Sequence, residues 1–387
     1  MIANEIASKK RAQTALVGRQ EPGGRRLSLA AQVAGDLERQ MDDGTLEPGD
    51  RLPLCNDLCR QYGVSLITVR GALASLTAQG RIESRWRGGI YVKANSDVKQ
   101  MESTKTISLV AELASNPFSA GILAGAVEAA SSAGYQVILS ATKDDPEVEA
   151  AQIHDLASRV DGTLVVPVNH TDSHAAAFEQ LVDNNRPLVF VDHYIEGIDA
   201  PRVTSDNVRG GYLATEHLLE QGCKRVYALT SGRHSTSSRE RLQGHMLALQ
   251  AHGHLFDPSL ICHSPDIHYQ AGQDLTREIL HRERGTQKLG IFAINDVLAA
   301  GAYISIKQAG LRIPEDVAVV GYDDVHAATM DPPLTSIRQD LSEMGRRAVR
   351  LLLSLKHGKP AASELVPVEL IVRSSTIGRI NESSDRA

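Results

Sequence analysis

The chain has 387 residues, of which 42% are hydrophobic and 23% charged, a composition typical of a globular protein with two or three domains. It has no run of 18 apolar residues, and its first residues lack the apolar segment of a secretory signal. We therefore expect no membrane span and no targeting peptide, and we expect the protein to reside in the cytoplasm. The four cysteines are few for this length and fit a reducing compartment better than a disulfide-linked scaffold.

The net charge of −6 is unevenly distributed along the chain. Residues 1–95 carry 14 Lys and Arg against 10 Asp and Glu, whereas the remainder carries 27 against 37. A basic N-terminal part on an acidic body permits that part alone to bind a polyanion. Residues 1–26 hold much of the positive charge in a polar, aperiodic stretch, which we expect to be a disordered tail. The ordered part that follows is therefore close to neutral.

Residues 27–94 have the pattern of a winged helix-turn-helix. In chain order, the expected elements are helices from Leu29 to about Gly44, over 54–62 and over 66–79, and a hairpin of strands over 81–85 and 90–93. Ser28 and Ser65 are suitable N-caps for the first and third helices. The third helix has one apolar face, formed by Val69, Ala72, Leu73 and Leu76.

Residues 95–105 are polar and aperiodic, which indicates a linker, and the pattern changes from residue 106 to 377. There, short apolar runs alternate with amphipathic helical stretches, and residues 378–387 form a second expected tail. Strands buried on both faces have this pattern, so the predicted fold class is α/β with parallel sheets, and the length favours two lobes. The runs are ISLVAEL, YQVILSA, GTLVVPV, PLVFVD, RVYALT, LGIFAIN and VAVVGYD.

Polar side chains follow five of these runs. They include Asn116, Asp144, Asp192, Asn295 and Asp323. In open parallel sheets, ligands bind beyond the carboxyl ends of the strands, and carboxylates and amides suit the hydroxyl groups of a polyhydroxylated ligand. The competing interpretation is that each residue merely caps the next helix. Five such residues together favour a ligand-binding cleft.

Motifs for catalysis and metal binding are missing from the sequence. It contains no GxxxxGK[ST] phosphate loop, no GxGxxG after a strand, no HExxH and no GxSxG. The histidine pairs His252 with His254 and His263 with His268 lack a third ligand nearby. We therefore expect neither an enzyme, nor a metal site, nor a cofactor.

Two parts of the chain resemble known families. Residues 28–93 resemble the GntR-type winged helix through the segments PGDRLP, YGVS and TVR. Residues 105–377 resemble the LacI/GalR effector domain, akin to periplasmic sugar-binding proteins, through RLQGH, IPEDVAVVGYDD and PPLTSIRQDLSEMGRRAV. The combination resembles regulators of the arabinose-repressor type.

The resemblance implies a homodimeric transcriptional repressor whose affinity for operator DNA changes when a small molecule, a sugar or sugar derivative, closes the cleft. It also implies three crossovers between the lobes, near residues 204, 338 and 363. Carried over one by one, the ligand positions are Phe118, Asp144, Asp192, Arg241, Asn295, Asp323 and Gln339. The alternatives are a sugar- or nucleoside-binding protein and a sugar-processing enzyme with an accessory DNA-binding head.

The head departs from its family at positions that contact DNA. Asn56 and Leu66 stand where arginines are usual, and Arg87 replaces a wing glycine. On the exposed face of the third helix, we expect Arg70 to reach guanine or phosphate, and we hypothesise that Ile67, with Leu66, packs on thymine methyl groups. The candidate DNA contacts are Arg51, Ser65, Ile67, Thr68, Arg70, Arg85, Arg87 and Gly88.

Overall fold

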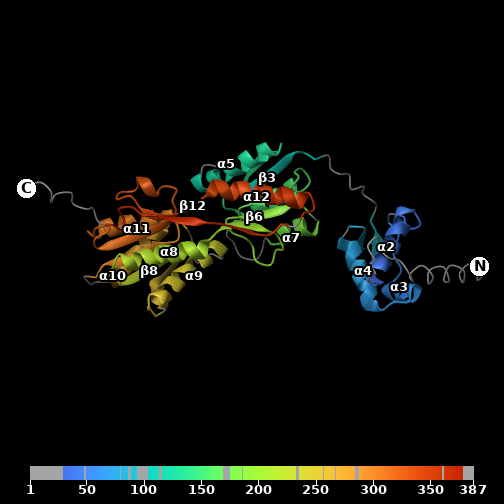
Figure 1. Cartoon of the computed structure of the whole chain (residues 1–387), viewed down its shortest axis with the longest axis horizontal. Helices are drawn as coiled ribbons and strands as arrows, with labels where there is room; N and C mark the ends of the chain where they lie inside the picture. Colours follow the sequence, from blue (N-terminus) through green and yellow to red (C-terminus); the bar gives the residue numbers. More distant parts are fainter. Residues whose placement is uncertain are drawn as a thin grey trace, which may run out of the picture. The chain divides into compact units, whose positions relative to one another are not determined.

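The computed structural model divides into two compact units, Met1–Ser103 and Thr104–Ala387, which we call the head and the body (Figure 1). Each is considered by itself. The predicted tails over 1–26 and 378–387 and most of the predicted linker over 95–105 lie outside the described residues. The structure describes residues 29–47, 49–78, 80–85, 89–93, 103–112, 116–168, 175–184, 186–231, 235–255, 257–265, 267–283, 287–359 and 361–377.

The head is a winged helix-turn-helix, as the sequence predicts. Its elements are α2 (Leu29–Asp42), α3 (Cys55–Tyr62), α4 (Leu66–Ala78) and the antiparallel pair β1 (Ile82–Arg85) and β2 (Gly89–Val92). The predicted apolar face of α4 is buried against the core formed by α2, α3 and the strands. Gly63 ends α3 in the left-handed region (φ 66°), where its N–H bonds to the carbonyl of Cys59, and this conformation favours glycine.

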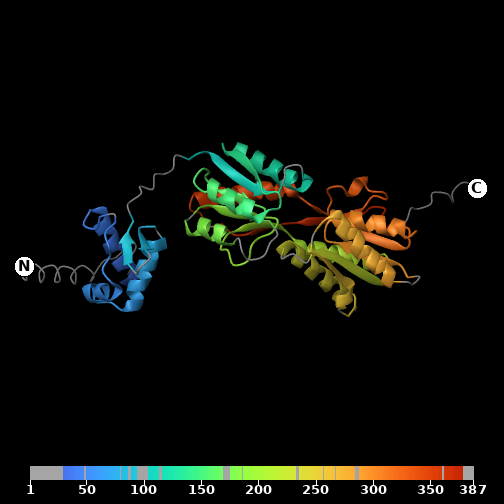
Figure 2. The same cartoon turned by 180° about the vertical axis from the view of Figure 1, so that it is seen from behind.

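The body contains two six-stranded sheets, each mostly parallel, which define two lobes (Figure 1 and Figure 2). The first sheet has the order β13-β7-β6-β5-β3-β4, with β3 (Thr106–Ala111), β4 (Gln136–Ala141), β5 (Thr163–Val165), β6 (Leu188–Val191), β7 (Arg202–Ser205) and β13 (Glu364–Val366). The second has the order β14-β12-β11-β10-β8-β9, with β8 (Arg225–Ser231), β9 (Ile261–Ser264), β10 (Leu289–Ala293), β11 (Val317–Asp323), β12 (Thr335–Gln339) and the antiparallel β14 (Val368–Ile371).

Helices cover both faces of the first sheet. Alternate residues of β3 enter different cores: Ile107 and Leu109 pack with α5 (Pro117–Ser132) and α12 (Leu341–Lys356), whereas Val110 packs with α6 (Pro146–Leu156) and α7 (Ala175–Asp183). The second sheet packs with α8 (Asn207–Glu220), α9 (Thr236–Ala251), α10 (Tyr269–Arg282) and α11 (Asp296–Gln308). Short 3₁₀ turns lie at Pro258–Leu260 and Ala327–Thr329. The predicted α/β class with parallel sheets is confirmed.

Three helix pairs cross where both backbones carry glycine. A Cβ on Gly244 of α9 would lie 2.0 Å from the carbonyl oxygen of Val208, and one on Gly211 of α8 would lie 1.9 Å from that of Arg241. The same close approach joins α5 to α12 at Gly125 and Gly345, and α10 to α11 at Gly272 and Gly301. Only glycine permits these separations, so the pairs are held at fixed positions along their axes.

The chain passes between the lobes three times: from β7 to α8, from β12 to α12 and from β13 to β14. The carboxyl ends of the parallel strands of both sheets therefore lead towards the region between the lobes. Among the described residues, no helix is long and apolar enough to span a membrane.

Candidate functional site: a cleft between the lobes of the body

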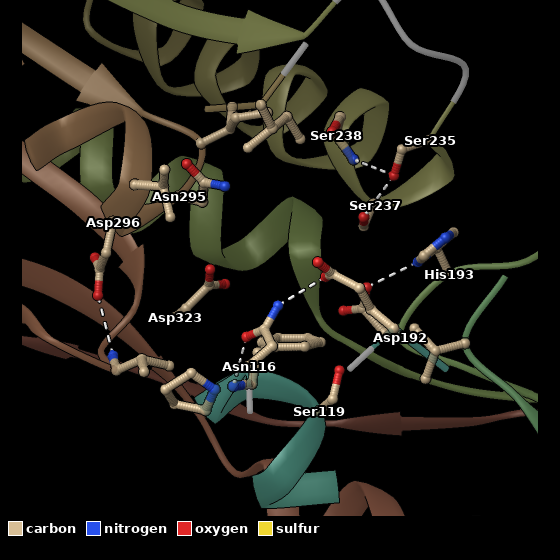
Figure 3. A pocket seen from close by; sticks show the side chains of 18 of the residues that line it. Asn116, Ser119, Asp192, His193, Ser235, Ser237, Ser238, Asn295, Asp296 and Asp323 are labelled. Carbon is tan, nitrogen blue, oxygen red and sulfur yellow. Dashed lines mark hydrogen bonds and ion pairs between the residues drawn. The ribbon is translucent and has the colours of Figure 1, made fainter. Parts of the chain in front are cut away.

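A cavity of about 730 Å³ lies between the lobes and is lined from both of them. The first lobe contributes residues that follow β3, β4, β5 and β6, and the second lobe contributes residues that follow β8, β9 and β10 or that end and follow β11. Figure 3 shows Asn295 and Asp323 of the second lobe across from Asp192 and His193 of the first. The volume lies within the usual range for small-molecule sites.

The structure brings six of the seven predicted ligand residues to the cavity wall. These are Phe118, Asp144, Asp192, Arg241, Asn295 and Asp323. The seventh, Gln339, is not among the lining residues. Its Nε2 donates to Oδ1 of Asp323 at 2.7 Å, so Gln339 lies behind that carboxylate.

Arg241 is buried on α9, and protein acceptors fix its position. Its Nε donates to Oδ1 of Asn207 at 2.9 Å, and its Nη1 donates to the carbonyl oxygen of Ile294 at 2.7 Å. The guanidinium also lies 3.7 Å above the centre of the Tyr322 ring. The stacking on Tyr322 and the two hydrogen bonds hold the guanidinium in one orientation, which preorganises it for a ligand.

The guanidinium lies between carboxylates of the two lobes. Nη1 is 3.5 Å from Oδ1 of Asp323, in the second lobe, and Nη2 is 3.9 Å from Oδ1 of Asp192, in the first. Arg241 thus has one acidic partner on each side of the cleft. The cation neutralises part of the negative charge that the carboxylates bring to the cavity.

Asp192 has an unusual conformation for a buried carboxylate. Its φ is 70°, in the left-handed region, and its Oδ2 lies 2.8 Å from Nδ1 of His193, whose Nε2 lies 2.6 Å from the carbonyl oxygen of Pro167. The other oxygen, Oδ1, is buried and has no hydrogen-bond partner among the described residues. A buried acceptor without a hydrogen bond costs about 1–3 kcal/mol, and the Arg241 guanidinium 3.9 Å away offsets only part of this cost. A ligand donor would remove this cost.

Two of the residues predicted at strand ends also cap helices. The competing interpretation, that such residues merely cap the next helix, therefore holds for the amide oxygen of each. Oδ1 of Asn116 accepts from the N–H of Phe118 at the start of α5, and Oδ1 of Asn295 accepts from the N–H of Leu298 at the start of α11. In each case the cap uses the amide oxygen. The NH₂ group of Asn295 remains a donor at the cavity wall.

Several lining residues were not predicted from the sequence, among them Ser235, Ser237, Ser238 and His268. Ser235 caps α9 by accepting from the N–H of Ser238, and its hydroxyl lies 2.8 Å from that of Ser237. Serine is a common N-cap, so Ser235 could have marked the start of a helix in the sequence, but no apolar run directly precedes it.

Asp296 also lines the cavity. Desolvation raises the pKa of Asp296 to about 6, although the hydroxyl of Ser336 and the N–H of Val325 donate to it and lower the pKa. Among the described residues, no group of three metal-ligating side chains could hold an ion.

The head places its candidate DNA contacts around the start of α4. Ile67 has 83% of its surface exposed and Leu66 has 38%, and Arg70 is also exposed. Ser65 and Thr68 share a 2.9 Å hydrogen bond between their hydroxyls, and Ser65 Oγ also accepts from the N–H of Thr68, which caps the helix.

The remaining candidate contacts belong to the wing. Arg51 is exposed and pairs with Tyr91 of β2 through an isolated β-bridge. Arg85 ends β1, but its side chain is not described. Arg87 and Gly88 lie outside the described residues.

Two family profiles match the chain, one on each unit. The bacterial regulatory proteins of the gntR family match residues 29–92, and the periplasmic binding protein-like domain matches residues 215–376. The HTH-type transcriptional repressor PurR of Aliivibrio fischeri is 31% identical over 286 residues, which cover 72% of this chain and 83% of that protein. The chain belongs to this family of transcriptional repressors.

Other members of the repressor family extend the likeness to about nine tenths of the chain. The arabinose metabolism transcriptional repressor of Geobacillus stearothermophilus is 28% identical over 354 residues, 89% of this chain and 96% of that protein. The solved complex of the transcriptional regulator CelR with cellobiose has a TM-score of 0.64 and 27% identity, and covers 90% of this chain and 100% of that chain. The protein is a DNA-binding transcriptional regulator, as the sequence predicts, with a GntR-type head and a periplasmic-binding-protein-like body.

Proposed function

We propose that this regulator is a repressor whose affinity for operator DNA changes when a sugar or sugar derivative binds between the lobes of the body. The observation that carries the proposal is the arrangement of Arg241 between Asp192 and Asp323, one carboxylate from each lobe. A ligand that contacts both carboxylates must bring the lobes into a defined relative position. The solved complex of CelR contains cellobiose, and another relative is named for arabinose metabolism, which supports a sugar here.

The chemistry of the cleft favours a ligand rich in hydroxyl groups. Oδ1 of Asp192 needs a donor, Arg241 offers donors in a fixed fork, and Asn295 offers an amide NH₂. Adjacent hydroxyls of a sugar donate and accept at once, so one ring can satisfy all three groups. Phe118 adds an apolar surface for the face of the ring.

A thermal-shift screen of the full chain with monosaccharides, disaccharides and nucleosides tests this proposal. A ligand present at 100 times its dissociation constant stabilises the folded state by about 2.7 kcal/mol, which raises the melting temperature measurably. We expect a sugar to produce the largest rise. A rise with nucleosides alone would contradict the assignment to sugars.

We propose that the cleft binds its ligand without converting it. The relatives are named as regulators, which supports binding over catalysis. Incubation of the purified protein with the sugar found in the screen should return the sugar unchanged. Release of a product would favour the alternative, a sugar-processing enzyme with an accessory head.

We propose that α4 reads thymine methyl groups through Ile67. The N-terminal end of a recognition helix contacts base edges in the major groove, and the thymine methyl is the apolar feature displayed there. Ile67 is 83% exposed at this end of α4, and the exposed positions 71 and 74 are the small residues Gly71 and Ala74, which permit a close approach. Arg70, also exposed, lies on the same face and suits guanine or phosphate.

Substitution of uracil for thymine in the operator tests this contact, because uracil lacks only the methyl group. The operator is first selected from random DNA with the full-length protein. We expect uracil at one or two positions per half-site to weaken binding about three- to tenfold, which corresponds to one buried methyl-sized contact. The same substitution should have little effect on the Ile67→Ala variant. An equal loss for both proteins would show that Ile67 does not contact the methyl group.

We also propose that the protein acts as a homodimer in the cytoplasm. From residue 27 to 95 the head carries eight basic and eight acidic residues, so beyond its predicted tail one head has no net positive charge to attract DNA. Two heads on a palindromic operator would multiply the specific contacts of Arg70, Arg51 and the wing. Sedimentation with the selected operator should give two chains per DNA. One chain per operator would contradict the dimer.

A further inference from the structure

The three segments that connect the lobes are hydrogen-bonded to one another at the crossovers. Ser205 ends β7, Gln339 ends β12 and Val366 ends β13, so each is the last strand residue before a crossover. The hydroxyl of Ser205 donates to Oε1 of Gln339 at 2.5 Å, and the N–H of Asp206 donates to the carbonyl of Val366 at 2.9 Å. In the second sheet, Gln339 also pairs with Val368 of β14. The connecting segments therefore form one bonded hinge.

Gln339 connects this hinge to the cleft. The oxygen of its amide accepts from Ser205 in the first sheet, whereas the nitrogen donates to Oδ1 of Asp323 at the cavity wall. Both Ser205 and Gln339 are buried, with 0% and 5% of their surfaces exposed. The Ser205 hydroxyl could accept from a reversed amide, but a reversed amide would also place two acceptor oxygens together at Asp323, which favours the observed orientation.

The Asp323 carboxylate is also the group that faces a ligand. Its Oδ1 is shared between Gln339 and Arg241, which approaches to 3.5 Å. A ligand hydroxyl that donates to this carboxylate competes with Gln339 for its lone pairs. Any shift of Gln339 then changes its hydrogen bond with Ser205, which belongs to the other lobe.

We propose that the chain Ser205–Gln339–Asp323 is a latch through which the ligand at Asp323 sets the relative position of the lobes. Gln339 is then a positioning residue of the hinge, not a direct ligand contact as the family resemblance implies. The inference rests on the proposed function, because the lobe position matters only if it controls operator binding. It adds a route from the cleft to the hinge that uses two buried side chains outside the cavity lining.

The test is the Ser205→Ala variant of the full-length protein, since Ser205 is outside the cavity lining and its hydroxyl joins the lobes. The measured quantity is the ratio of operator dissociation constants with and without a saturating sugar, chosen from L-arabinose, D-ribose, cellobiose and the other compounds of the screen. We expect the loss of the bond to move this ratio about three- to tenfold towards one, the effect of one buried hydrogen bond. Ser205→Thr, which keeps the hydroxyl, should restore most of the wild-type ratio.

Ser305→Ala is the matched control. Ser305 is also a buried serine, and its hydroxyl donates to the carbonyl of Gln273 at 2.7 Å within the second lobe, away from the hinge. It should lower the melting temperature as Ser205→Ala does and leave the ratio within twofold of the wild type. A ratio for Ser205→Ala equal to that of Ser305→Ala would overturn the latch. A wild-type ratio of one with every compound would instead refute the proposed function, on which the latch rests.

Discussion

At the scale of single residues, the cleft depends on one guanidinium whose direction is fixed. Arg241 uses Nε and Nη1 to hold its position and lies between two acidic side chains. Lysine would keep the charge but lose the planar fork and its stacking on Tyr322. We expect Arg241→Lys to weaken binding of the screened sugar at least tenfold, measured by calorimetry.

A second arginine provides the control for that substitution. Arg312 forms an exposed bidentate pair with Asp316 on the second lobe, away from the cavity. Arg312→Lys should bind the sugar as the wild type does, because exposed ion pairs contribute little. If Arg241→Lys also binds as the wild type does, the guanidinium has no part in recognition.

A buried histidine predicts how one part of the fold responds to acid. His245 is fully buried, with Nδ1 2.8 Å from the hydroxyl of Thr215, and burial lowers the pKa of its imidazole to about 4. In the unfolded chain the pKa of this imidazole is about 6.5. Below that pH the imidazole is protonated in the unfolded state but stays neutral in the folded state. The stability that His245 provides when neutral is therefore present above pH 6.5 and lost as the pH falls towards 4.

Urea unfolding of the wild type and of His245→Gln, at pH 7.5 and pH 5, isolates this contribution. The difference between the two proteins cancels other titrations, including those of Asp296 and Glu149, whose pKa values are raised by desolvation. We expect the unfolding free energy of the wild type to fall by about 2 kcal/mol more than that of the variant between the two pH values. A constant difference would contradict a neutral buried imidazole.

Residue-level prediction from sequence worked where a polar group follows a buried strand. The strand-end argument found Asp192, Asn295 and Asp323, all of which line the cavity. It did not find Ser235, which lies several residues beyond the run RVYALT at the start of α9, or His268, whose preceding strand β9 is not an apolar run. Gln339 was expected as a ligand contact from the family resemblance alone, which does not tell a residue at the cavity wall from one that lies behind Asp323.

At the scale of elements, the crossing of α8 and α9 positions Arg241. The carbonyl of Arg241 itself packs against Gly211, and Gly244 packs against Val208 one turn away. A Cβ at position 244 would meet backbone atoms at 2.0 and 2.6 Å, so the helices must separate.

We expect Gly244→Ala to destabilise the body by about 1–3 kcal/mol, the usual cost of overpacking, in thermal unfolding. Gln243→Ala, an exposed change one residue earlier in α9, should melt close to the wild type. Equal melting temperatures for both variants would refute the close crossing.

Seven strands of the body were predicted, and five were missed for a common reason. The predicted strands are continuous apolar runs, which mark strands covered on both faces. The missed strands β7, β9, β12, β13 and β14 are short and carry polar residues, as in ICHS and TSIRQ. Three of them, β9, β13 and β14, are at sheet edges, where one side is free of a neighbouring strand. Their assignment depends on tertiary pairing that local sequence does not encode.

At the scale of the whole molecule, the uneven distribution of charge agrees with different roles for the two units, with DNA contact left to the head. The excess of acidic residues lies in the body, and a body that repels phosphate leaves DNA contact to the head. The head is neutral beyond its predicted tail, so its affinity must come from a few placed side chains rather than from net charge. The sequence alone predicts this organisation because composition and hydrophobic pattern both change at the same place.

The central claim is that a ligand in the cleft controls binding by the head. Fluorescence anisotropy of the selected operator, titrated with the full-length protein with and without the screened sugar, tests it most directly. We predict at least a tenfold difference in operator affinity for the wild type, and a much smaller difference for Arg241→Lys at the same sugar concentration. Identical operator affinities with and without a sugar that demonstrably binds would contradict the account.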